Sequence, residues 1–171
     1  MEQVTRRGLV AGLAAAGAAG AAGIASAMPK AISVQDIKKE GDAACLYHCD
    51  FAGKPRQMQM FNNISNHYSV FGANPFDCQL AVVAHSGGIR YFLQDWEGTP
   101  WAKDKFDMDV WERASSLSKN GLKIYLCEIT YSRLKIDKAK TRNAEFLSFV
   151  PSGVATVAAL QSKGFAYIKV Q

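Results

Sequence analysis

Residues 146–170 read FLSFVPSGVATVAALQSKGFAYIKV, and this stretch has the clearest secondary-structure pattern in the chain. Its first five residues predict a strand or a strand-like link. Ser152 then predicts the start of a helix, because a serine hydroxyl there accepts hydrogen bonds from free backbone N–H groups. Gly164 is suited to end that helix, and the six residues after it alternate as in a strand. The stretch therefore predicts a strand–helix–strand unit.

The same alternation extends toward the N-terminus. Apolar runs predict strands, and segments whose apolar residues recur every three or four positions predict helices. Strands are expected at residues 44–50, 78–84 and 122–128, and helices at residues 56–71, 89–93, 106–119 and 130–136. The run at 78–84 is almost wholly apolar, as in a sheet that is covered on both faces. The sequence thus predicts an α/β fold, a three-layer sandwich around a mainly parallel sheet of about five strands.

The N-terminal residues have the pattern of an export signal. Arg6 and Arg7 precede an apolar run, which ends in the small-residue sequence Ala25-Ser26-Ala27. The arginine pair resembles the bacterial twin-arginine motif. We expect residues 1–27 to be this signal, with an uncleaved N-terminal anchor as the alternative. The mature chain would then act in the periplasm, with a polar lead-in at 28–43, a single domain at 44–171 and no membrane attachment after cleavage.

The composition excludes few classes of protein. The chain has 171 residues, is 49% hydrophobic and carries a formal net charge of +5. Its densest basic stretch runs from Arg133 to Arg142. A nucleic-acid-binding protein usually concentrates its positive charge more than this. We therefore expect no nucleic acid partner and interpret the basic residues as a solvated surface, with a small anionic ligand as the alternative.

The four cysteines are Cys45, Cys49, Cys78 and Cys127, and the sequence cannot choose among their three complete pairings. Cys45 and Cys49 lie roughly 13 Å apart along a straight strand, whereas a disulfide needs Cα atoms within about 7 Å. Cys45 with Cys78 is the more plausible bridge. No CxxC motif is present, so a thioredoxin-type site is not supported.

Cys127 is the main candidate for chemistry. It lies at the carboxyl end of a predicted central strand, next to Glu128 and a short predicted helix. Ligands of parallel α/β sheets bind at this edge. A cysteine near a helix start can form a reactive thiolate, and Glu128 is a candidate binding residue. The alternative is a buried cysteine that behaves as a small hydrophobic residue.

The loop after the strand at 78–84 should lie level with Cys127. It begins with His85, a residue that can act as a base, orient a thiolate or ligate a metal. Ser86, Gly87 and Gly88 follow, and their N–H groups are candidates for binding an anion. The alternative is a histidine that only hydrogen-bonds to the loop.

Two weaker possibilities concern other side chains. His48, Cys49, His85 and Cys127 could converge on a metal ion from neighbouring strand ends, although no close His/Cys spacing argues for it. Trp96 and Trp101, in the irregular segment before the helix at 106–119, could cover a site or pack against a subunit.

Three segments resemble the DsrE/DsrF-like family of small sulfur-relay proteins. They are LKIYLCEITYSRLKI at 122–136, FVPSGVATVAALQSKGFAYIKV at 149–170 and LAVVAHSGGIRYFL at 80–93. The resemblance covers most of residues 44–171. It implies a flavodoxin-like sandwich that assembles into homotrimers or hexamers. It also implies that Cys127 carries persulfide sulfur and that His85 lies in the loop beside it, although Ser86 stands where a glycine is more usual.

We therefore expect a periplasmic homo-oligomer that binds or transfers sulfur through Cys127, assisted by His85. It would need no cofactor other than a covalent persulfide on Cys127, and its partner would be a sulfur-donor protein or a small sulfur compound. The alternatives are a non-catalytic binding or assembly module and a protein that binds a metal through histidine and cysteine.

Overall fold

The computed structural model describes residues 28–171 except residues 72–73 and 75–76. The predicted twin-arginine signal at residues 1–27 lies outside the described residues and stays a prediction. Within the described ranges, each helix is too short or too polar to span a membrane.

Among the described residues, six parallel strands form one sheet in the order β1-β5-β4-β3-β2-β6. The strands are β1 (Lys30–Ala31), β2 (Ala43–Cys49), β3 (Cys78–Ala84), β4 (Lys123–Cys127), β5 (Leu147–Val150) and β6 (Ala166–Lys169). The helices are α1 (Lys54–Phe71), α2 (Asp109–Ser118), α3 (Glu128–Leu134) and α4 (Gly153–Ser162), with 3-10 helices η1 (Val34–Asp36), η2 (Ser86–Phe92) and η3 (Lys138–Lys140).

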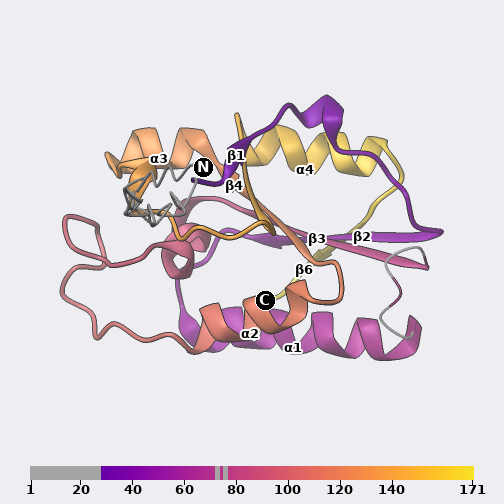
Figure 1. Cartoon of the computed structure of the whole chain (residues 1–171), viewed down its shortest axis with the longest axis horizontal. Coiled ribbons are helices and arrows are strands. Elements are labelled where there is room, and N and C mark those ends of the chain that lie inside the picture. The colour runs from indigo at the N-terminus through magenta and orange to yellow at the C-terminus, as the bar shows by residue number, and fades with distance from the viewer. Residues whose placement is uncertain (1–27, 72–73, 75–76) are drawn as a thin grey trace, which may run out of the picture.

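Helices cover both faces of this sheet. Figure 1 shows α1 and α2 along one face and α3 and α4 on the other side. Leu80 and Val82 of β3 belong to the core on the α1 side, whereas Ala81 and Val83 pack in the core with α4. Successive residues of a strand point to opposite faces, so β3 is buried on both sides. This confirms the predicted three-layer α/β fold.

The sheet has one strand more than predicted. The additional strand, β1, lies in the predicted polar lead-in, where Lys30 and Ala31 pair with Ser148 and Phe149 of β5. Both residues of β1 are exposed. A two-residue strand with exposed side chains has no apolar alternation, so the hydrophobic pattern contains no signal for it.

The ends of α4 agree with the sequence pattern. The Ser152 hydroxyl accepts a hydrogen bond from the backbone N–H of Ala155 at 3.3 Å, and Gly164 has a φ of +87°. A left-handed residue after a helix favours glycine. By contrast, α3 begins at Glu128, two residues earlier than predicted. It therefore follows directly on Cys127, with no loop between the strand and the helix.

The predicted disulfide between Cys45 and Cys78 is wrong, since all four cysteines are free. Cys45 pairs with Leu80 and Cys78 pairs with Ala43, so the two cysteines are diagonal neighbours on adjacent strands. An offset of two residues at ~3.3 Å each, on strands ~4.8 Å apart, separates the two Cα atoms by roughly 8 Å, beyond the usual reach of a disulfide. Burial in the core raises the pKa of the Cys45 thiol to about 12.

Candidate functional site

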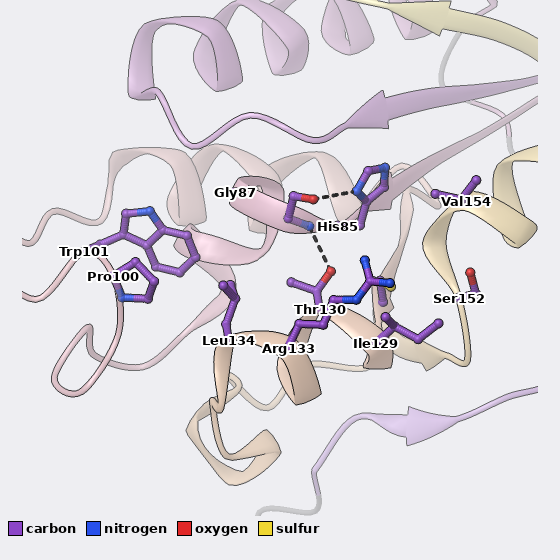
Figure 2. Close-up of a pocket in the computed structure, with 12 residues that line it drawn as sticks. His85, Gly87, Pro100, Trp101, Ile129, Thr130, Arg133, Leu134, Ser152 and Val154 are labelled. Carbon is purple, nitrogen blue, oxygen red and sulfur yellow. Dashed lines mark hydrogen bonds between the residues drawn. The ribbon is translucent and has the colours of Figure 1, made fainter.

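A cavity of about 520 Å³ opens at the carboxyl edge of the sheet, where β3 and β4 end. Figure 2 shows it between the loop after β3, helix α3 and the start of α4. Its lining residues are His85, Ser86, Gly87, Pro100, Trp101, Cys127, Ile129, Thr130, Arg133, Leu134, Ser152 and Val154. The predicted residues His85, Ser86, Gly87 and Cys127 therefore share one cavity.

Cys127 is the last residue of β4 and lies in the wall of the cavity. Only 5% of the residue is exposed, and the cavity that it lines offers a reagent a route to it. Its side chain makes no capping hydrogen bond to α3. The cysteine is thus neither a surface thiol nor one enclosed in the core.

Gly153 brings the first turn of α4 against both Cys127 and His85. A Cβ atom at Gly153 would lie 2.9 Å from the Cβ of His85 and 3.1 Å from the Cβ of Cys127. Those separations are shorter than normal carbon–carbon contacts. The glycine therefore allows the ends of β3 and β4 to meet the start of α4, and it places the two predicted residues side by side.

The imidazole of His85 is not bonded to Cys127. Its Nε2 lies 2.6 Å from Nε2 of His48, and its Nδ1 lies 3.0 Å from Oγ of Ser86. Both ring nitrogens are thus engaged, and among the described residues no hydrogen bond joins this ring to Cys127. Burial is the main cause that lowers the pKa of both His48 and His85. The prediction that His85 acts on the thiol is therefore not supported by a direct hydrogen bond, and it stays a prediction.

The Ser86-Gly87-Gly88 loop has mainly a packing role. Ser86 has a φ of +51°, and its N–H donates to Oγ1 of Thr130 at 2.9 Å. The N–H of Gly88 donates to the His85 carbonyl. Gly88 lies outside the cavity lining, and a Cβ there would be 2.0 Å from the carbonyl oxygen of Cys49. Two of the three N–H groups predicted to bind an anion are therefore already used.

Glu128 points away from the cavity. Its Oε1 lies 2.7 Å from Nζ of Lys138, and it lines a separate hollow with Tyr131 and Asp137. The structure therefore places this predicted binding residue on the other side of α3 from the Cys127 cavity.

Arg133 also lines the cavity, although the sequence pattern indicated it only as the first residue of the basic stretch and not as a site residue. Figure 2 shows its side chain reaching into the cavity from α3. It is exposed, and in the part of the chain that the structure describes no residue forms an ion pair with it. Ile129, Thr130, Arg133 and Leu134 share a helical face by their spacing, which is the sequence signal that could have found it.

The rest of the wall is mostly apolar. Trp101, Ile129, Leu134 and Val154 contribute side chains to it, which agrees with the prediction that Trp101 could cover a site. Trp96 instead packs in the core against Tyr91. The cavity thus combines one thiol, one guanidinium and apolar walls, an arrangement suited to a small anion.

Of the four residues considered for a metal, only His48 and His85 meet. The side chain of Cys49 belongs to the core on the α1 face, because successive residues of β2 alternate between faces. Asp50, the residue after β2, lies close to the two histidines instead. Its Oδ2 atom forms an ion pair with Nζ of Lys169 at 2.6 Å.

Comparison with known proteins gives a family and a similar fold. Residues 52–170 match the model of the DsrE/DsrF-like family. The solved structure of a protein of unknown function from Methanobacterium thermoautotrophicum superposes with a TM-score of 0.60 at 22% sequence identity, covering 75% of this chain and 99% of that one. At this identity the similarity concerns the fold alone. Among curated proteins, none matches the chain significantly.

Proposed function

We propose that Cys127 binds and transfers sulfur as a persulfide. The chain belongs to the DsrE/DsrF-like family, and membership of this family supports a sulfur-relay-type protein. The observation that carries this proposal is the position of Cys127. Its side chain lines a cavity at the carboxyl edge of the sheet, and the same cavity contains the guanidinium of Arg133.

The transfer is an exchange at sulfur and needs no external oxidant. The thiolate of Cys127 attacks the outer sulfur of a donor persulfide, R–S–SH. A sulfur–sulfur bond to Cys127 forms while that of the donor breaks, and the donor leaves as a thiolate. With thiosulfate the same attack leaves a persulfide on Cys127 and releases sulfite. The reverse exchange with an acceptor thiolate returns Cys127 to its starting state.

The cavity residues have separate roles in this exchange. Arg133 pairs with the negative charge of the donor and of the leaving group, and its guanidinium matches an oxyanion such as thiosulfate. Trp101 and Leu134 exclude water and so strengthen that attraction. His85 positions the end of β3 against Cys127 across Gly153, and its imidazole does not take the proton of the thiol.

We also propose that the mature chain works in the periplasm as a homo-oligomer, a trimer or hexamer. Arg6 and Arg7 support the export route. Ile129 and Val154, at the rim of the cavity, are 41% and 67% exposed. Exposed apolar side chains beside a site are typical of interfaces. Light scattering of the purified mature chain measures the assembly, and a monomer at micromolar concentration would contradict it.

Mass spectrometry tests the persulfide directly. The mature protein is incubated with polysulfide or thiosulfate, alkylated and digested. We expect one added sulfur atom on the peptide that contains Cys127, and none in Cys127→Ser. Cys78→Ser is the matched control and should keep the adduct, because Cys78 is fully buried at the opposite end of β3.

The alternative function, a non-catalytic binding or assembly module, predicts a different result. Cys127 would then stay unmodified under conditions in which a small alkylating reagent still reaches it. That outcome would remove the sulfur role and leave the fold and the cavity unchanged.

A further inference from the structure

A second group of side chains lies beside the Cys127 cavity. His48 is near the end of β2, Asp50 follows that strand, and His85 follows β3. One ligand atom from each residue lies within 4.8 Å of the other two. All three residues are partly buried. The parallel pairing of β2 with β3 produces this cluster, because it brings the ends of the two strands together.

The two imidazoles are held so that their Nε2 atoms face each other. Nδ1 of His48 lies 2.8 Å from the hydroxyl of Tyr167, and Nδ1 of His85 lies 3.0 Å from that of Ser86. The two Nε2 atoms are 2.6 Å apart. In metal sites, the second ring nitrogen of a histidine ligand is usually held in this way by a neighbouring group.

We propose that His48, Asp50 and His85 bind a divalent transition metal ion such as Zn²⁺. Two imidazole nitrogens and one carboxylate oxygen are a donor set for zinc and similar ions, whereas Mg²⁺ and Ca²⁺ prefer oxygen alone. Three protein ligands leave one tetrahedral position open for water or an exogenous ligand.

The required movement is small. With Zn–N bonds of about 2.0–2.1 Å in a tetrahedral site, two ligand nitrogens lie roughly 3.3 Å apart. The Nε2 atoms of His48 and His85 would have to separate by less than about 1 Å to reach that spacing.

Lys169 opposes the metal ion in this site. Its position on β6 is directly opposite His48, and its ammonium pairs with Asp50 at 2.6 Å. An incoming cation must displace this ammonium from the carboxylate. Removal of the lysine charge should therefore strengthen metal binding, while removal of a ligand should weaken it. A purely structural role for the cluster predicts no such difference in sign.

The inference goes beyond the proposed sulfur function and does not depend on it, because Cys127 is not a member of the cluster. Titration of the full mature chain, without a histidine tag, with Zn²⁺ and with Co²⁺ tests it. We expect one equivalent to bind. The bound Co²⁺ should show visible d–d bands and no sulfur-to-cobalt charge-transfer band in the near ultraviolet.

Variants identify the ligands. His48→Ala and Asp50→Asn should weaken Zn²⁺ binding by at least about 100-fold, and Tyr167→Phe by about tenfold through loss of the outer hydrogen bond. Lys169→Gln should strengthen it. His67→Ala is the matched control and should change nothing. His67 belongs to α1 and bonds to Tyr47 of β2, whose side chain lies in the core on the α1 face of the sheet, away from the cluster.

Circular dichroism of each variant checks that it is folded. If a variant of a ligand residue does not fold, Tyr167→Phe still tests the site, because it removes only the hydrogen bond to Nδ1 of His48. Three outcomes would overturn the metal site. They are no Zn²⁺ or Co²⁺ binding to the unaltered protein at micromolar concentration, a cysteine-type cobalt spectrum, and equal affinity in His48→Ala.

Discussion

Gly153→Ala tests the packing that unites the proposed site. The new Cβ would lie 2.9 Å from the Cβ of His85 and 3.1 Å from that of Cys127, whereas carbon atoms pack best at about 3.5–4.0 Å. Neither Cβ can rotate away, because each is attached directly to the backbone at a strand end. The methyl group must therefore push α4 away from the sheet.

The magnitude follows from two opposing terms. Overpacking in a close contact costs about 1–3 kcal/mol. Replacing glycine lowers the entropy of the unfolded chain, which returns about 0.4–1 kcal/mol. We expect a net loss of about 1–2 kcal/mol in the free energy of unfolding, and a fall in Tm of roughly 2–8 °C for a chain of this size.

Thermal unfolding and the alkylation rate of Cys127 measure the two consequences together. The variant should unfold at lower temperature, and Cys127 should show altered reactivity with iodoacetamide because its contact with α4 has changed. Ala155→Ser, two positions later in α4 and exposed, should change Tm by less than about 2 °C. A Gly153→Ala protein as stable as the unaltered one would refute the close approach of α4 to β3 and β4.

Two further predictions concern charge. Arg133→Gln should reduce sulfur transfer from thiosulfate to Cys127 by about tenfold or more, because the oxyanion loses its charged partner. Transfer from an uncharged sulfur donor should be less affected. Equal losses with both donors would argue against a role of Arg133 in binding the oxyanion. Burial raises the pKa of Cys45 from 9.0 to about 12, so its contribution to stability is fully present below pH 9.0 and is lost as the pH rises toward 12. Denaturant unfolding between pH 8 and pH 11 should show a shallower decline for Cys45→Ala, and parallel curves would contradict the shift.

Local patterns were enough to predict most of the elements. The strand expected at 78–84 is β3 without change, and Ser152 caps α4 as predicted. Both features depend on residues that are close in the chain. The strand depends on a run of apolar residues, and the cap depends on a hydroxyl that accepts a hydrogen bond from a backbone N–H in the next turn. The position of Cys127 at the end of β4 could be predicted for the same reason, because a strand end is a local feature.

The partners of these residues depend on the tertiary structure. Strand order places β6 next to β2, and so brings Tyr167 and Lys169 to His48 and Asp50 across more than a hundred residues of chain. Hydrophobic periodicity in the sequence does not predict that β6 lies next to β2.

Hydrophobic periodicity and capping are short-range effects, so the sequence alone predicts the α/β class, the positions of the main strands and the location of Cys127 and His85 at strand ends. It does not predict that the His85 ring turns to His48, that Arg133 lines the cavity or that the cysteines stay free. Those outcomes depend on strand register and side-chain direction, which arise from contacts between segments distant in the chain.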